Sequence, residues 1–159
     1  MIYVGYQGIG KSTLCSNVVN CVDLESGNFF VDGKRCDDWY KIYANIASHL
    51  SGQGKDVFVS SHKVLREYMV KEGIEFVVIY PSIELKDKWI EKLKQRYELT
   101  KKEKDLRALL NAQEKYEENI DDLSKEKSRI IITSMYYSLN QAIRCYENIW
   151  GETFDIQVS

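Results

Sequence analysis

Eight consecutive residues near the start of the chain have the types and spacing that polyphosphate binding requires. The run Gly5-Tyr6-Gln7-Gly8-Ile9-Gly10-Lys11-Ser12 fits the pattern G-x-x-x-x-G-K-[ST] at every fixed position. Glycines let the backbone turn tightly, so that successive N–H groups point inward at an anion. We expect Lys11 to reach the β- and γ-phosphates and the Ser12 hydroxyl to hold a magnesium ion. The expected nucleotide-binding residues are Gly5, Gly8, Ile9, Gly10, Lys11, Ser12 and Thr13.

The elements that must position this motif can be predicted from the pattern of apolar residues. Residues 2–4 are apolar and predict a strand, and residues 12–20 predict a helix, with Leu14, Val18 and Val19 at helical spacing. Further strands are predicted at 21–24, 57–59, 74–80 and 129–133, and further helices at 38–51, 62–71, from 82 onward and at 138–150. Strands therefore alternate with helices along the chain.

This alternation predicts the fold class and the edge of the sheet at which a ligand would bind. Parallel strands need long crossover connections, which are usually helical, so the sequence predicts an α/β fold with a parallel sheet of five strands covered on both faces. Ligands of such sheets bind beyond the carboxyl ends of the strands. A single domain is expected to span residues 1–159, because no linker interrupts it.

One highly charged stretch, residues 98–127, breaks the alternation before the last predicted strand. Its apolar residues follow a helical repeat, which predicts one or two inserted helices. The insertion is either a solvated decoration or a mobile lid over the phosphates. A lid would carry Arg96, just before the insertion, and Arg107, inside it, to the phosphates as catalytic charges.

Together these features resemble the nucleoside monophosphate kinase superfamily and the related kinases of the shikimate and gluconate type. The motif at residues 5–13 is the specific part of the resemblance, and the rest is architecture. The chain as a whole also looks like uncharacterised kinase-like proteins of phages and Gram-positive bacteria. The resemblance implies a three-layer P-loop NTPase fold, with residues 98–127 as a lid-like insertion.

The resemblance also suggests acceptor-side residues. In shikimate- and gluconate-type kinases, acidic residues after the second strand touch the substrate and the magnesium shell, and Asp23-Leu24-Glu25 stands in that place. Asp23 is expected to orient the attacking hydroxyl or to bind magnesium through water, unless it merely forms a turn; Glu25 is a candidate substrate contact. Arg66 would bind the acceptor's anionic group, or would be a surface helix residue beside Glu67.

Two further features bear on the acceptor. Residues 28–35 occupy the place where monophosphate kinases bind their substrate, so Phe29 or Phe30 could stack on a base and Lys34 with Arg35 could hold its phosphate. Equally, the phenylalanines could be core and the basic pair a solvated turn. In the monophosphate kinases the third strand usually ends in an aspartate, whereas here Ser60 follows. This departure keeps the metabolite-kinase alternative open.

The composition of the chain argues against several other classes of function. The chain has 159 residues and a net charge of −2, which argues against general nucleic-acid binding. No apolar run is long enough to span a membrane and no signal peptide is readable, so a cytoplasmic location is expected. All four cysteines are expected to be free packing residues, because no metal-binding spacing occurs. His62 is interpreted as a helix cap or a hydrogen-bonding residue rather than a base.

The sequence therefore predicts an ATP- and Mg²⁺-dependent phosphotransferase acting on a small acceptor, foremost a nucleoside or deoxynucleoside monophosphate. Two alternatives stay open: a kinase of a hydroxylated metabolite or modified base, and a nucleotide-binding regulatory protein without transfer. A homodimer is also left open, and no membrane partner is expected.

Overall fold

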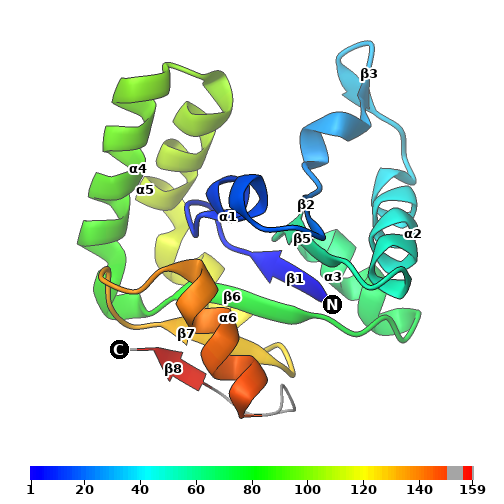
Figure 1. Ribbon diagram of the computed structural model, residues 1–159. Coiled ribbons are helices and arrows are strands. Elements are labelled where there is room, and N and C mark those ends of the chain that lie inside the picture. The colour runs from blue at the N-terminus through cyan, green and yellow to red at the C-terminus, as the bar shows by residue number, and fades with distance from the viewer. Residues whose placement is uncertain (150–155, 159) are drawn as a thin grey trace. The chain divides into compact units, whose positions relative to one another are not determined.

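The computed structural model describes residues 1–149 and 156–158, and for 156–158 only the backbone. Contacts divide the chain into two compact units (Figure 1). The first contains Met1–Gly5 and Lys11–Val78, and the second contains Tyr6–Gly10 and Ile79–Ser159. Parallel strands alternate with helices in both units, which confirms the α/β class.

The first unit contains a parallel set of strands in the order β2-β5-β1. Its elements are β1 (Ile2–Gly5), α1 (Lys11–Asn17), β2 (Cys21–Asp23), the 3-10 helix η1 (Ser26–Phe29), β3 (Phe30–Val31), β4 (Lys34–Arg35), α2 (Trp39–Gly52), β5 (Asp56–Ser60) and α3 (Lys63–Lys71). Tyr3 of β1 lies opposite Phe58 of β5, and Val22 of β2 lies opposite Val57. Because β1 and β5 are buried along nearly their whole length, their sequences are continuously apolar rather than alternating.

Helix α2 packs on this unit through a narrower stripe than its sequence predicts. Tyr43, Ala44 and Ala47 are fully buried. Ile42 and Ile46 share the helical spacing of these residues but are 47% and 39% exposed. Small alanines let the helix approach the strands closely, and the isoleucines beside them are then left at the edge of the contact.

The second unit contains strands in the order β6-β7-β8. Its elements are β6 (Val77–Pro81, beginning in the first unit), the 3-10 helix η2 (Ile83–Leu85), α4 (Lys86–Thr100), α5 (Glu103–Leu123), β7 (Arg129–Ile132), α6 (Leu139–Asn148) and β8 (Ile156–Val158). The five strands predicted from sequence correspond to β1, β2, β5, β6 and β7. β8 lies in the tail whose sequence is uninformative, and it pairs with β7 in parallel.

Helices α4 and α5 form a helical hairpin, residues 86–123, in which they lie side by side and antiparallel (Figure 1). The chain reverses at Lys101, which adopts the left-handed conformation with φ +54°. Both helices bury apolar residues, namely Trp89 and Leu93 of α4 and Leu109, Tyr116, Ile120 and Leu123 of α5. The stretch 98–127 contains helix, as predicted: residues 98–100 complete α4, Glu103–Leu123 form α5, and 124–127 follow it. Leu110 lies on the outside of α5 and is 51% exposed.

One predicted helix end differs from the structure, and another lies outside the described residues. Helix α1 ends at Asn17, so Val18 and Val19 fall after it and are exposed instead of packing. Helix α6 starts after Ser138, which caps it through a reciprocal pair of hydrogen bonds with Gln141. The predicted end of that helix, Trp150, lies outside the described residues.

The expectation that all four cysteines are free packing residues is wrong. Cys15 of α1 and Cys21 of β2 form a disulfide, with Cα atoms 4.8 Å apart. The early end of α1 turns the chain back, which brings these two residues together although they are six apart in sequence. Cys36 and Cys145 are free, but they are exposed and do not pack in the core.

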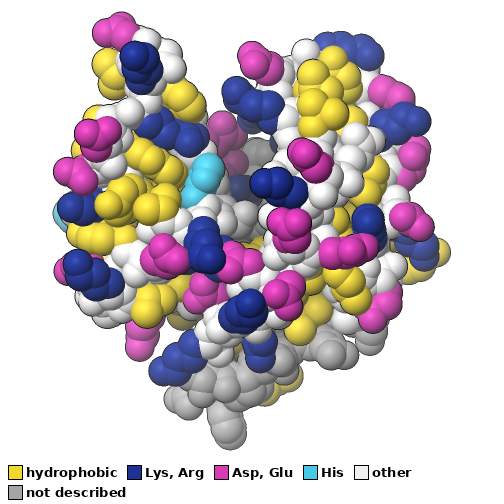
Figure 2. All heavy atoms as spheres, turned by 180° about the vertical axis from the view of Figure 1, so that it is seen from behind, with side chains coloured by type: hydrophobic (Ala, Val, Ile, Leu, Met, Phe, Trp, Pro, Cys, Tyr) yellow, Lys and Arg dark blue, Asp and Glu magenta, His cyan; other side chains and the backbone are white. Residues whose placement is uncertain are grey.

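The surface mixes charges of both signs. Over the described part of the face in Figure 2, acidic and basic side chains are interspersed, in keeping with the net charge of −2. Among the residues that the structure describes, no helix has both the length and the apolar character needed to cross a membrane.

Candidate functional site

The motif of residues 5–12 forms a strand, a loop and the start of a helix. Strand β1 ends at Gly5, the glycine loop (residues 5–10) follows, and α1 begins at Lys11. Gly8 and Gly10 have φ values of +88° and +100°, which are costly for any residue with a Cβ atom. Gly10, a fixed glycine of the pattern, therefore stands where this backbone needs it, and Gly8, at a variable position of the pattern, is needed for the same reason.

The chemistry-bearing residues at the start of α1 are accessible. Ser12 and Thr13 are exposed, and Lys11 is half-buried. The Lys11 ammonium lies close enough to His62 to help lower the pKa of that imidazole. The positive charge of Lys11 therefore acts on His62, which follows β5, within the first unit.

The carboxyl ends of β2 and β5 meet around the hydroxyl of Tyr43. This hydroxyl accepts a hydrogen bond from Ser60 N at 2.9 Å and donates to the carbonyl oxygen of Leu24. Burial raises the pKa of Tyr43 to about 12, and the charges of Asp23 and Glu25 act in the same direction. Asp23, Glu25 and Ser60 are therefore brought together around one buried phenol. Sequence reasoning had assigned Tyr43 only to a helix core.

Arg35 lies between two aromatic rings. It ends a short hairpin, β3 and β4, whose turn residues Asp32 and Gly33 both have positive φ. Its guanidinium carbon is 4.4 Å from the ring centroid of Phe30 and 4.4 Å from that of Trp39. One guanidinium nitrogen also donates to the Ser26 hydroxyl at 3.0 Å. Cation–π contacts of this kind hold the guanidinium in a defined plane.

His62 stands beside this cluster as a neutral imidazole. Its ring meets Trp39 edge to face, with centroids 5.0 Å apart. Burial lowers the pKa of His62 to about 4, and the positive charges of Arg35 and Lys11 contribute. His62 occupies the N-cap position of α3, as expected, but its side chain makes no capping hydrogen bond. At neutral pH it can donate or accept a hydrogen bond without carrying charge.

Arg66 is buried, with 3% of its surface exposed. It lies on α3, and its Nε donates to the carbonyl oxygen of Ser61 at 3.4 Å. The alternative of a surface residue beside Glu67 is therefore wrong. Burying a guanidinium is costly unless its donors are engaged, so its place just after β5 is held by specific contacts.

The two arginines expected in a lid lie on the helical hairpin and have carboxylate neighbours. Arg96 Nε is 3.0 Å from an oxygen of Asp105, a carboxylate that is 4% exposed. Arg107 is exposed and lies 3.7 Å from Glu103 on the same helix. Arg96 thus joins α4 to α5, whereas Arg107 makes only a surface contact.

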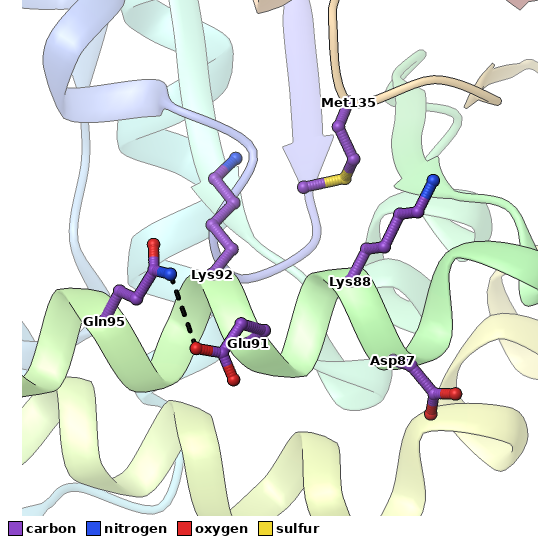
Figure 3. A pocket seen from close by; sticks show the side chains of 6 residues that line it. All are labelled: Asp87, Lys88, Glu91, Lys92, Gln95 and Met135. Carbon is purple, nitrogen blue, oxygen red and sulfur yellow. Dashed lines mark hydrogen bonds between the residues drawn. The ribbon is translucent and has the colours of Figure 1, made fainter.

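A shallow depression of about 450 Å³ lies along α4. Figure 3 shows Lys88 and Lys92 projecting to one side of this helix, with the thioether of Met135 reaching toward them from the loop after β7. The ammonium of Lys92 is 4.3 Å from the ring centroid of Trp89. Desolvation lowers the pKa of Lys92, and the charge of Arg96 adds to this effect.

Comparisons with known proteins add nothing to this geometry. No protein-family model matches the chain, and a search of curated proteins found no match. The fold and the site together define an α/β protein with a glycine-rich loop before its first helix.

Proposed function

We propose that the chain is an ATP- and Mg²⁺-dependent phosphotransferase that moves the γ-phosphoryl group to a small acceptor, foremost a nucleoside or deoxynucleoside monophosphate. The observation that carries the proposal is the motif of residues 5–12, in which Gly8 and Gly10 adopt positive φ between a buried strand and a helix. This backbone can direct N–H groups at a polyphosphate.

On the donor side, the roles follow from residue type and position. The glycine loop would surround the phosphates, Lys11 would neutralise their charge, and the exposed Ser12 hydroxyl would ligate magnesium. Magnesium bound there would supply charge neutralisation between the phosphates. One protein ligand suits this ion, because Mg²⁺ keeps several waters and takes further ligands from phosphate oxygens.

On the acceptor side, the proposal uses the cluster around β2, β4 and β5. Arg35, held in plane by Phe30 and Trp39, has the geometry to pair with a phosphate or carboxylate. Asp23 and Glu25, beside the Tyr43 hydroxyl, would orient the attacking oxygen or the magnesium waters. Because phosphoryl transfer needs little base catalysis, positioning and charge would supply most of the rate.

A second candidate, a kinase of a hydroxylated metabolite, is favoured by one observation. The carboxyl end of β5 presents the half-buried Ser60, where a nucleotide kinase of the expected type would carry an aspartate. Hydroxyl groups at this place suit hydrogen bonds to a polar acceptor as well as to a phosphate.

Nucleotide binding is tested by calorimetry with Mg·ATP on the wild-type chain and on Lys11→Ala. We expect the variant to lose binding at least tenfold, because it removes the cation of the motif. Lys41→Ala is the matched control, since Lys41 is an exposed lysine of α2 paired with Asp38. Equal affinity of Lys11→Ala and the wild type would refute the donor site.

Transfer is tested by ADP production with a panel of nucleoside monophosphates and sugar acids. We expect Arg35→Lys to raise the KM for the acceptor about tenfold and to leave the KM for ATP unchanged, because an ammonium cannot reproduce a planar bidentate contact. Turnover with a sugar acid alone would select the metabolite kinase. Binding of Mg·ATP without turnover of any acceptor would select the regulatory alternative.

A further inference from the structure

The side chain of Gln7, at a variable position of the motif, ties the glycine loop to helix α5. Its Nε2 donates to the carbonyl oxygen of Ala108 at 3.0 Å and to Asn111 Oδ1 at 3.1 Å. The two partners are more than 100 residues away in sequence. A residue that phosphate binding leaves unspecified is therefore engaged with the helical hairpin.

Helix α4 holds the backbone of the same residue. The indole N–H of Trp89 donates to the Gln7 carbonyl oxygen at 2.9 Å. A Cβ atom at Gly8 would lie 2.9 Å from Leu93 Cδ2 and 3.2 Å from Trp89 Nε1. The loop at Gln7 and Gly8 is thus packed directly against α4, and Gly8 is needed both for its φ and for this close approach.

The contacts of Gln7 continue into a bend of α5. Lys115 interrupts this helix with φ −132° and ψ 18°. Across the bend, Asn119 Nδ2 donates to Asn111 Oδ1 at 2.8 Å. Residues eight apart in a straight α-helix are about 12 Å apart along the axis, beyond the combined reach of two asparagine side chains. The bend is therefore what allows Asn119 and Gln7 to share Asn111 Oδ1.

Tyr6 extends this network on the loop side. Its ring packs edge to face on Tyr116, next to the bend, with centroids 5.9 Å apart. Burial raises the pKa of Tyr6, and hydrogen bonds with Asn119 and Gln7 oppose the shift. The Tyr116 hydroxyl in turn donates to the carbonyl oxygen of Ser82 at 2.7 Å. The loop, the bend and the end of β6 are connected through buried groups.

We propose that the helical hairpin is a brace that sets the conformation of the glycine loop, and that Gln7 and Trp89 are positioning residues for the donor's phosphates. The inference rests on the proposed function. Swinging the hairpin away as a lid would break the hydrogen bonds at Gln7 and uncover Gly8. The bonds of Gln7 with Ala108 and Trp89 are partly buried, so their loss is costly and the hairpin stays on the loop during the reaction.

The test removes these three hydrogen bonds with two substitutions. Gln7→Met keeps the length of the side chain without its donor, and Trp89→Phe keeps a smaller aromatic ring without the N–H. We expect each variant to weaken Mg·ATP binding by roughly five- to tenfold, the size of effect that the loss of one or two hydrogen bonds produces. The KM for the acceptor should not change. Gln113→Met, an exposed glutamine of α5, is the matched control and should bind as the wild type does.

Amide hydrogen exchange without nucleotide separates positioning from global stability. We expect faster exchange at residues 6–12 in both variants. Thermal unfolding of Gln7→Met should lie near that of Gln113→Met, whereas Trp89→Phe should unfold at a lower temperature because it also removes buried ring volume. Wild-type affinity and wild-type exchange in Gln7→Met and Trp89→Phe would overturn the brace. If the unmodified chain binds no Mg·ATP, both the proposed function and this inference are refuted. If the wild type binds Mg·ATP and the two variants bind it equally well, only the brace is refuted.

Discussion

The guanidinium of Arg96 lies 3.0 Å from Asp105, a carboxylate that is almost completely buried between α4 and α5. Thr100 donates a second hydrogen bond to the same carboxylate. This ion pair joins the two helices through Arg96, the residue that the sequence assigns to the phosphates if the insertion is a lid. The carboxylate is the centre of the contact, because it accepts from both neighbours.

We therefore expect Asp105→Ala to lower the free energy of unfolding by about 2–3 kcal/mol, since it leaves the arginine and the threonine hydroxyl without this partner. Urea denaturation measures the loss. Glu103→Ala removes the exposed partner of Arg107 and should cost less than about 0.5 kcal/mol. Equal losses of unfolding free energy in the two variants would contradict the idea that the buried carboxylate contributes more than the exposed one.

The low pKa of His62 makes stability depend on pH. Burial and the charges of Arg35 and Lys11 lower this pKa to about 4, whereas in the unfolded chain it is about 6.5. As the pH falls below 6.5, the unfolded chain takes up the proton first, so stability is lost progressively toward pH 4 and is fully present above 6.5. At pH 5 the loss is about 2 kcal/mol relative to pH 7.5.

Urea denaturation at pH 7.5 and pH 5 tests this dependence in the wild type and in His62→Gln. The variant should lack most of the difference between the two pH values. The exposed His49 provides the control, and His49→Gln should keep the wild-type dependence. A His62→Gln protein that loses as much stability as the wild type at pH 5 would show that other groups cause the effect.

The disulfide between Cys15 and Cys21 closes a short loop after α1. By the entropy of loop closure, its removal in Cys15→Ser/Cys21→Ser should lower the free energy of unfolding by about 2 kcal/mol. Thermal unfolding with and without a reductant gives the same comparison for the unmodified chain. Cys36→Ser and Cys145→Ser, at the exposed free thiols, should leave stability unchanged. Insensitivity of the wild type to reductant would rule out this contribution.

The two loop glycines with positive φ differ in their surroundings. At Gly10 the nearest atom to an added Cβ is 4.0 Å away, whereas at Gly8 Leu93 lies within 2.9 Å. Both alanine substitutions impose backbone strain of about 1–2 kcal/mol, and Gly8→Ala adds an overlap that should cost a further ~1–2 kcal/mol. Denaturation of Gly8→Ala, Gly10→Ala, Leu93→Ala and Gly8→Ala/Leu93→Ala separates backbone strain from overlap, because Leu93→Ala measures the cost of the cavity alone. Similar losses in the first two variants would exclude the packing contribution.

Much of the site could be predicted because its signals are local. The motif, the strand before it and the helix after it are encoded within about 15 residues. Gly8 and Gly10 have positive φ, a conformation that glycine adopts more easily than other residues, so the residue type alone indicates it. The alternation of strand and helix predicted the α/β class for the same reason. The candidate residues Asp23 and Ser60 were selected by the rule that parallel strands present their carboxyl ends to ligands.

The rest depended on contacts between distant segments. Periodicity placed Tyr43 on a buried helix face but could not show that its hydroxyl meets Ser60 and Leu24 at the ends of two strands. Spacing left Arg66 undecided between surface and interior, and packing of α3 buried it. The disulfide was missed because pairing of Cys15 with Cys21 needs the chain reversal that follows an unusually short α1.

The sequence by itself determined the glycine-rich motif, the fold class and the end of the parallel strands at which a ligand is expected, since each depends on residue types a few positions apart. Only the tertiary structure decided that Trp89 and Gln7, 82 residues apart, hold the loop against the helical hairpin. The physical reason is that a hydrogen bond between distant segments depends on how whole elements pack, and the spacing of residues along one segment carries no record of it.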